Sequence, residues 1–468
     1  MKRWIRWVVM GLVLAGLAAC GQITDGDVLT NQSSGEGEGR FVVVLKKNAV
    51  TNGVLDAITA SGGAVVRTIP QVGLAIVTSA SPSFTDDIKA HGAVMDAGPL
   101  FAETLPEGAN ASLPEDGPTA ADDLFNGGLV WGVERVHAPE AWADGVTGSH
   151  DTVVAVIDTG IAWNHPDLAP NVVYVDCYTS AGSYDGGACN PYPAYSDHGT
   201  HVAGTVAAAF AGGRVVGVGP NLGLAGYNTF EEIPGCGVCS YSDSRWMAML
   251  DAADRGFDVI NMSLGGYVEL GSGKGTSDYT AYLAAEKRIA RYVNGAGTVM
   301  VASSGNGAVD LNGRLVHVPG DTPSMVNVGA TGIRPNPRNE PGSYDVIAFF
   351  SNYGAAVDVA APGGDCGLAG SCDPATRPAN WAEYLVLSSI VAPNPTCAAT
   401  FSCAVGYGWK AGTSMAAPHV SGVVGLIRDV RPDLPANQVK SLLRRTAENL
   451  GDRQLFGHGM VDAYAATR

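Results

Sequence analysis

Charged residues are scarce in this chain, and basic residues are scarcer than acidic ones. Of 468 residues only 16% are Asp, Glu, Lys or Arg, whereas 46% are apolar. This balance predicts a large packed core and argues against a disordered chain. The formal net charge is −17. Such an excess of negative charge repels phosphate backbones, so nucleic acid is not an expected partner.

The N-terminal apolar stretch is too short to cross a membrane comfortably. It runs from Trp7 to Ala19 and follows the basic residues Lys2, Arg3 and Arg6. A span needs roughly 20 residues, so this pattern indicates a signal peptide and an exported protein. Residues 17–21 (LAACG) resemble a bacterial lipobox, in which Cys20 becomes the lipidated first residue. We therefore expect a signal peptide over 1–20 and a membrane-anchored precursor; an ordinary signal peptide is the alternative.

The remaining cysteines indicate disulfide bonds. Nine cysteines less Cys20 leave eight, and an even number in an exported chain is typical of a disulfide framework. Local pairing is the simplest connectivity: Cys177–Cys189, Cys236–Cys239, Cys366–Cys372 and Cys397–Cys403. A redox or zinc motif is an alternative for Cys236 and Cys239, but the chain has no second C-x-x-C and no nearby His at ligand spacing.

The region before residue 126 divides into a tether, a small module and a linker. Residues 21–39 are rich in Gly, Ser, Asp and Glu, which predicts a flexible tether. Residues 40–102 predict a βαββαβ order, which is a ferredoxin-like split unit. Its expected elements are strands at 41–45, 64–69, 72–78 and 93–95, and helices at 52–61 and 83–91. Residues 103–125 are acidic and contain three prolines, which indicates a second, exposed linker.

Beyond residue 125 apolar strands alternate with helical stretches. Residues 153–157 and 299–303 are continuous apolar runs, as expected for strands of a parallel sheet that is covered on both faces. Helices are expected at 244–255, 280–294, 417–429 and 436–449. We therefore predict an α/β domain over 126–468, with three layers and a mostly parallel sheet.

Three separate blocks of this domain each offer one member of a catalytic triad. They are VAVIDTGI at 154–161 with Asp158, DHGTHVAGT at 197–205 with His198, and GTSMAAPHV at 412–420 with Ser414. The chain order Asp, His, Ser is that of subtilisin. The sequence resembles a subtilisin-like serine peptidase of the subtilase family. The resemblance implies a serine endopeptidase that acts on protein or peptide substrates, with residues 40–102 as its propeptide, an intramolecular chaperone and inhibitor.

The resemblance also assigns roles within the triad. Ser414 would be the nucleophile, His198 its general base, and Asp158 the carboxylate that orients the imidazole. His201 is an alternative base in the same block, and Asp197 and Asp167 are alternative carboxylates. A catalytically silent, lipid-anchored binding protein that keeps the fold is the alternative function, although such a relative usually lacks a triad member.

Two further blocks match the substrate site of the family. Asn306, in Ser303–Gly307, would donate its side-chain amide to the oxyanion, together with the backbone N–H of Ser414. The stretch Ser263, Leu264, Gly265 and Gly266 resembles the strand that pairs with substrate and would form one wall of the S1 pocket. Residues 302–305 would form the other wall.

No cofactor is expected for the chemistry, although family members often bind calcium for stability. Asp167 resembles a calcium ligand of some members, whereas Gly332 stands where one subgroup has an acidic residue. Structural calcium is therefore expected without an assigned site. The mature peptidase is expected to be extracellular once it is cut from its anchor.

Overall fold

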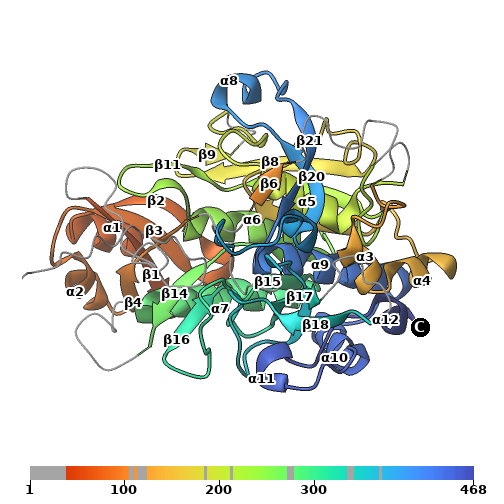
Figure 1. Ribbon diagram of the computed structural model, residues 1–468. Helices are drawn as coiled ribbons and strands as arrows, with labels where there is room; N and C mark the ends of the chain where they lie inside the picture. Colours follow the sequence, from red (N-terminus) through yellow and green to blue (C-terminus); the bar gives the residue numbers. More distant parts are fainter. Residues whose placement is uncertain are drawn as a thin grey trace, which may run out of the picture.

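The computed structural model describes residues 38–104, 110–112, 124–183, 187–210, 214–270, 279–334, 342–367 and 372–468 (Figure 1). Cys20, the expected signal peptide and almost all of the expected tether lie outside these residues. Among the described residues, no helix combines the length and the apolar character that a membrane span requires.

A central sheet organises the larger part of the chain. Its strand order is β18-β17-β15-β13-β7-β10-β8-β9, and β19 also pairs with β17. The pairs from β17 to β8 and the β17–β19 pair are parallel, whereas β18 and β9 are antiparallel at the edges. The strands are β7 (Val153–Asp158), β8 (Val172–Thr179), β9 (Gly182–Ser183), β10 (Gly223–Asn228), β13 (Val259–Met262), β15 (Val299–Ser303), β17 (Met325–Arg334), β18 (Tyr344–Ile347) and β19 (Val359–Pro362).

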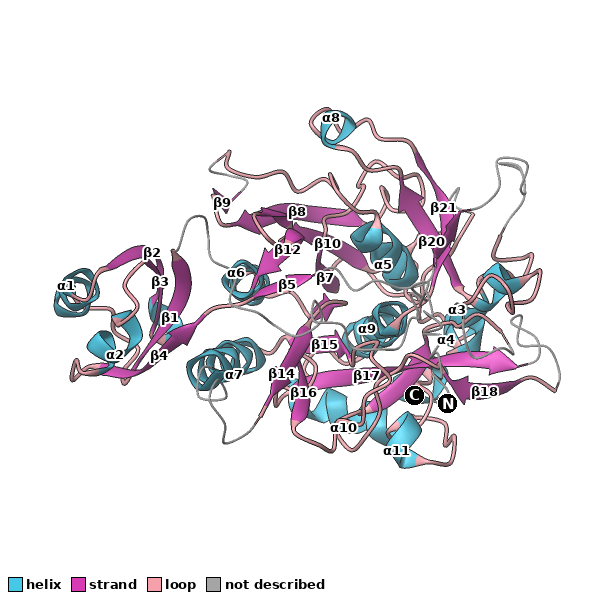
Figure 2. Ribbon diagram, turned by 60° about the vertical axis from the view of Figure 1, so that its left-hand side comes forward, coloured by secondary structure: helices cyan, strands magenta, loops and turns pink. Residues whose placement is uncertain are grey.

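Helices cover both faces of this sheet, because both faces of its strands are apolar. In β7, Val154 and Val156 pack with α5 (His198–Ala207) and α9 (Thr413–Val430), whereas Ala155 and Ile157 pack with α6 (Ser242–Asp254) and α7 (Tyr279–Ala296). Figure 2 shows the sheet between these two pairs of helices. The predicted three-layer, mostly parallel α/β fold is confirmed. The remaining helices are α3 (Trp131–Arg135), α4 (Ala138–Ala143), α8 (Pro395–Ala398), α10 (Ala436–Thr446), α11 (Arg453–Phe456) and α12 (Ala463–Thr467).

A small α+β module precedes this domain, with the predicted element order. It comprises β1 (Gly39–Leu45), α1 (Asn52–Ala60), β2 (Gly63–Ile69), β3 (Leu74–Ser79), α2 (Phe84–Lys89) and β4 (Val94–Pro99), and its sheet has the order β2-β3-β1-β4. One sheet face, with Val43 and Val77, packs on α1 and α2. The other face, with Val42 and Ile76, belongs to the same apolar cluster as α6 and α7. The module thus completes its core against the larger domain.

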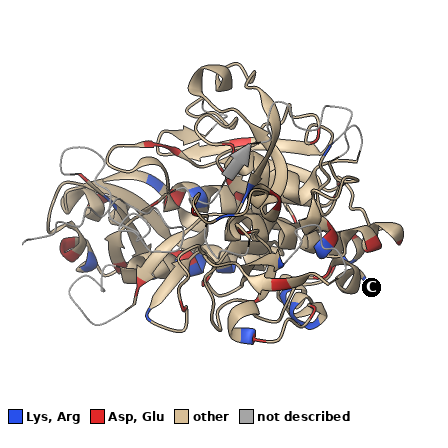
Figure 3. Ribbon diagram, viewed as in Figure 1, with Lys and Arg blue, Asp and Glu red and all other residues tan. Residues whose placement is uncertain are grey.

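Charged contacts accompany this apolar interface. Asp243 at the start of α6 is fully buried and accepts hydrogen bonds from Arg40 at 2.7 and 2.9 Å. Arg67 of β2 lies 3.2 Å from the same carboxylate. Figure 3 shows basic and acidic segments next to one another where the module faces α6. The negative charge of Asp243 is compensated mainly by Arg40 and Arg67 of the module. Without the module, this buried carboxylate would have to be rehydrated.

Two parts of the stretch expected as a linker are strands. β5 (Ala102–Thr104) pairs antiparallel with β12 (Gly237–Tyr241), which also pairs with β11 (Glu231–Ile233). β6 (Asn110–Ser112) pairs antiparallel with β21 (Val405–Lys410), whose other neighbour is β20 (Val386–Val391). Residues 105–109 and 113–123 of the expected linker lie outside the described residues. Composition indicated exposure here, whereas strand pairing with distant edges orders these two segments.

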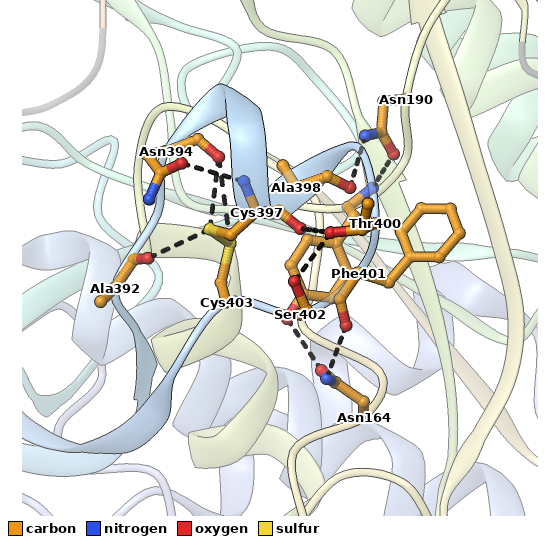
Figure 4. Close-up of a disulfide and its surroundings, with 11 residues drawn as sticks. Asn164, Asn190, Ala392, Asn394, Cys397, Ala398, Thr400, Phe401, Ser402 and Cys403 are labelled. Carbon is orange, nitrogen blue, oxygen red and sulfur yellow. Dashed lines mark hydrogen bonds between the residues drawn. A yellow bond between two sulfur atoms is a disulfide. The ribbon is translucent and has the colours of Figure 1, made fainter.

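Four disulfides join the eight cysteines as local pairs: Cys177–Cys189, Cys236–Cys239, Cys366–Cys372 and Cys397–Cys403. Cys397 and Cys403 close the loop between β20 and β21 (Figure 4). Asn394 caps α8 by accepting a hydrogen bond from Cys397 N at 2.9 Å. Asn190 and Asn164 donate to the carbonyls of Ala398 and Phe401. The disulfide loop is thereby fixed to the segment between Asp158 and His198.

Candidate active site

Asp158 and His198 form a buried pair at the carboxyl end of the central sheet. Asp158 is the last residue of β7 and His198 the first residue of α5. Nδ1 of His198 lies 2.8 and 2.9 Å from the two carboxylate oxygens of Asp158. The Thr159 hydroxyl joins the two loops, because it donates to Ser196 O and accepts from Gly199 N. With Nδ1 so engaged, Nε2 of His198 is left without a hydrogen-bond partner among the described residues.

Ser414 is the second residue of the long helix α9 and is 2% exposed. Its hydroxyl donates to the carbonyl of Ser263 at 3.1 Å, and the Ser263 hydroxyl donates to the carbonyl of Ser414 at 2.8 Å. The start of a helix carries partial positive charge, which favours developing negative charge nearby. The sequence pattern placed this helix from residue 417; its true start at Thr413 brings Ser414 into the first turn.

Asn306 lies beside Ser414 with its amide held in one orientation. Its Oδ1 accepts hydrogen bonds from the backbone N and the hydroxyl of Thr413, each at 2.8 Å. The Nδ2 donors therefore point to the other side. A Cβ added to Gly412 would lie 3.4 Å from Asn306 Nδ2 and 3.6 Å from Ser414 N. The side-chain amide and the backbone N–H thus border the same small space, as a pair of oxyanion donors requires.

The stretch Ser263–Gly266 follows β13 directly and faces the start of α9 through Ser263. Leu264 is buried in the core, and Gly266 begins β14 (Gly266–Glu269), which pairs with β16 (Leu315–Val318). A Cβ at Gly265 would lie 2.4 Å from the carbonyl oxygen of Val318, so a side chain at this position would force the two strands apart.

The alternative triad members have structural contacts instead. His201 is fully buried, and its Nε2 donates to the carbonyls of Val386 and Gly408. Burial, with Lys410 nearby, holds the pKa of His201 well below its usual value. Asp197 pairs with Lys410 at 2.9 Å. Neither residue contacts Ser414 among the described interactions.

The described residues show no cluster of acidic side chains for the expected calcium. No group of three or more His, Cys, Asp or Glu side chains within the described ranges is arranged to hold a metal ion. Asp167 instead accepts from the backbone N–H groups of Arg214 and Val215 and from the Tyr407 hydroxyl. At Gly332 a Cβ would lie 2.4 Å from Asp365 Oδ2. Glycine therefore makes room there for the carboxylate that pairs with Arg334.

Ser414 has polar support that the sequence motifs did not indicate. Ser421 lies about two turns further along α9. Its hydroxyl donates to Asn261 Oδ1 at 2.8 Å, and Asn261 Nδ2 donates to the Ser263 hydroxyl at 3.0 Å. This chain of bonds fixes the strand end that accepts the Ser414 hydroxyl. Residues 414 and 421 are spaced to lie on one face of α9, and this spacing was the only hint that the sequence offered. Their partner strand β13 could not be inferred from it, because β13 lies more than 150 residues away in sequence.

The chain is similar to known proteins in sequence and in fold. The sequence model described as "Subtilase family" matches residues 149–459. The chain is 32% identical over 342 residues to subtilisin DY of Bacillus licheniformis, which covers 73% of this chain and 99% of that protein. A protease of Pseudoalteromonas arctica superposes with a TM-score of 0.55 at 30% identity, over 75% of this chain and 99% of that one. The epidermin leader peptide processing serine protease of Staphylococcus aureus shares the fold, with a TM-score of 0.67 at 22% identity over 92% and 98% of the two chains.

Proposed function

The chain belongs to the subtilase family and is a subtilisin-like serine endopeptidase, and on this premise we propose that Asp158, His198 and Ser414 are its catalytic triad. The observation that carries the proposal is the doubly hydrogen-bonded Asp158–His198 pair, which leaves Nε2 as the free nitrogen of the imidazole. In this mechanism the Ser414 hydroxyl, which donates to Ser263 O at rest, transfers its proton to His198 Nε2 as Oγ attacks the peptide carbonyl.

The remaining steps use the same groups. His198 returns the proton to the leaving amine, and an acyl-enzyme on Ser414 Oγ is then hydrolysed by water. Asp158 holds the imidazole through Nδ1 and stabilises its positive charge. Asn306 Nδ2 and Ser414 N–H are the proposed donors to the oxyanion, and residues 263–266 the strand that binds substrate backbone.

Removal of the Asn306 amide should lower kcat and leave KM little changed, and an unchanged kcat would exclude this role.

A fluorophosphonate probe tests the catalytic proposal directly. Such a probe phosphonylates a serine that an adjacent base activates, so we expect one labelled residue, Ser414, identified by peptide mass spectrometry. Labelling should disappear in the His198→Ala variant, whereas His201→Ala should retain a labelled serine if the protein folds. A well-folded wild-type protein that is freed of residues 40–102 and still takes up no label would instead indicate a catalytically silent binding protein.

We also propose that residues 40–102 act as an inhibitory propeptide and that Cys20 anchors the precursor to a membrane. The support is the module's shared core with α6 and α7 and the two strands β5 and β6 that continue it across the larger domain. A cut in or near residues 103–122 would separate the anchor from the peptidase. The enzyme would then be exported, anchored first and extracellular after maturation.

Cell fractionation tests this release. We expect active enzyme in the soluble fraction with an N-terminus between residues 101 and 130, and uncut Ser414→Ala precursor with the membranes. The lipid anchor is tested separately by Cys20→Ser, which should move the precursor into the soluble fraction. Active enzyme found only on membranes with Cys20 still attached would contradict release but not the peptidase activity.

A further inference from the structure

Glu103 is a fully buried carboxylate in a segment of the chain that lies on an exposed strand edge of the peptidase domain. It sits in the middle of β5, opposite Ser240 of β12 in the antiparallel register. Its neighbour Ala102 packs with Ile233, Cys239 and Tyr241 on the other side of the strand. The backbone thus binds by strand addition, while the Glu103 side chain enters the interior of the domain.

The pocket around Glu103 is built from hydrogen-bond donors. Arg245 of α6 donates to the carboxylate from Nε, at 3.2 Å to both oxygens, and from Nη2 at 2.8 Å. The Ser242 hydroxyl adds a further bond at 3.2 Å to Oε1. Since Arg245 is itself 0% exposed, its donors depend on acceptors that the protein or a ligand supplies.

A second carboxylate holds Arg245 in place. Glu286 of α7 accepts from Arg245 Nη1 at 2.9 Å and Nη2 at 3.0 Å, and from Trp246 Nε1. Burial alone would lower the pKa of Arg245, but Glu103 and Glu286 together hold it well above its usual value. Glu286 therefore belongs to the wall of the pocket and keeps the guanidinium oriented whatever occupies the position of Glu103.

The chain direction relates this pocket to the active site. β5 lies on β12, and β6, six residues further on, lies on β21, whose last residue Lys410 is four positions before Ser414. A peptide that follows this course lies on β12 before it meets the region of Ser414. A side chain at the position of Glu103 is then on the amino-terminal side of the bond that Ser414 attacks.

We propose that Arg245 and Ser242 form a specificity pocket that selects substrates with a glutamyl side chain, or its isostere glutaminyl, upstream of the scissile bond. The inference rests on the proposed peptidase function and names a substrate class for it. In the precursor Glu103 occupies the pocket, so this residue of the chain itself shows which side chain the pocket prefers. An aliphatic side chain of the same size excludes water but leaves Nε of Arg245 without an acceptor and removes one of the acceptors of Nη2, which a buried site strongly disfavours.

The charges around Glu103 make the binding of a glutamyl side chain in this pocket depend on pH. Arg245 and Glu286 already form a neutral pair, and the Tyr282 hydroxyl lies 3.4 Å from Arg245 Nη2, so an ionised Glu103 makes the cluster net negative. Burial raises the pKa of Glu103, with Glu286 adding to the effect against the opposing pull of Arg245. A group whose bound pKa lies above its free value binds best at low pH, and this advantage fades as pH rises through the bound pKa.

Matched peptides test the pocket without altering the enzyme. The substrate is a peptide with the sequence of residues 99–112 (PLFAETLPEGANAS), and its variants carry Gln or Leu in place of Glu103. With the enzyme matured from the full chain, we expect kcat/KM for Leu to fall about 10–100-fold below that for Glu, and Gln to stay within about tenfold of Glu. Leu in place of Glu107 in the same peptide is the control for lost charge and should have less effect.

The pH dependence of the Glu-to-Gln ratio is an independent readout. The ratio should rise as pH falls through the pKa of the bound glutamyl side chain, and other pH effects on the enzyme cancel because both peptides use the same enzyme. In the Arg245→Met, Glu286→Gln variant, which avoids an unpaired buried carboxylate, the preference for Glu over Leu should disappear. Arg255→Met, at the end of the same helix, should keep it.

The results of these experiments distinguish a failure of the proposed pocket from a failure of the proposed peptidase activity. An enzyme that digests casein but cleaves the Leu peptide as well as the Glu peptide contradicts the pocket and leaves the peptidase proposal intact. A chain that digests neither casein nor any peptide contradicts the peptidase proposal itself. If the double variant does not mature, the peptide series with the wild-type enzyme still decides, because it involves no change to the protein.

Discussion

Ser414→Ala is expected to lower kcat for peptide hydrolysis by about 10⁶-fold, the effect known for loss of the nucleophile in subtilisin. The substitution removes the oxygen that is proposed to form the acyl-enzyme. It should leave the fold intact, because the Ser414 hydroxyl makes a single hydrogen bond, to Ser263 O, among the described contacts. Purified variant should unfold at nearly the wild-type temperature, and circular dichroism and a sensitive peptide assay measure both properties.

The same variant should accumulate as an uncut precursor if maturation is autocatalytic. Addition of a small amount of wild-type enzyme then distinguishes cleavage within one molecule from cleavage between molecules. Turnover by the pure variant above the contaminant level would show that another residue supplies the nucleophile, and the triad proposed here would be wrong.

Asp158→Asn is expected to lower kcat by about 10⁴-fold, a smaller loss than that at Ser414. Asparagine keeps the shape of the side chain but replaces one acceptor by an N–H₂ group. The amide can then donate to Nδ1 of His198, which places the remaining imidazole proton on Nε2, the nitrogen that must accept the serine proton. KM should change little, since Asp158 is only 1% exposed and its carboxylate is engaged by His198.

Asp197→Asn is the matched control for this result. Asp197 is adjacent to His198 in sequence, but its side chain pairs with Lys410 near the surface. Its loss should change kcat by less than tenfold, because this pair is partly open to solvent and, among the described contacts, does not touch the imidazole of His198. Equal losses for the two variants would mean that the effect comes from general charge near His198 and not from a specific bond to Nδ1.

Local sequence patterns were sufficient for β7, β15 and the strands of the small module, and they indicated the three proposed triad residues. β15 has the predicted bounds Val299–Ser303, because a continuous apolar run has one stable environment, a covered parallel sheet. Asp158 ends β7, His198 begins α5 and Ser414 is the second residue of α9, so each proposed triad residue lies at one end of a helix or strand. The start of α9 was less visible, since the small residues around Ser414 favour several backbone conformations about equally.

Interactions between distant segments could not be predicted in this way. Glu103 lies among acidic residues and prolines, a composition typical of an exposed linker, yet its environment is set by Arg245, 142 residues later. The support of Ser414 by Asn261 likewise depends on which strand end meets which helix turn. Polar residues of this kind have no periodic pattern of their own, and their burial becomes evident only when the partner is known.

The pairing of β5 with β12 has a consequence for how the protein behaves before it is active. β12 has hydrogen-bonding backbone on the side away from β11, and an open strand edge of this kind promotes aggregation between chains. In the full-length chain that edge is already occupied by Ala102–Thr104 of the same molecule. If maturation removes residues 102–104, this strand edge becomes exposed only when the domain is already folded. The five residues of β12 then limit the contact that two enzyme molecules can make through it.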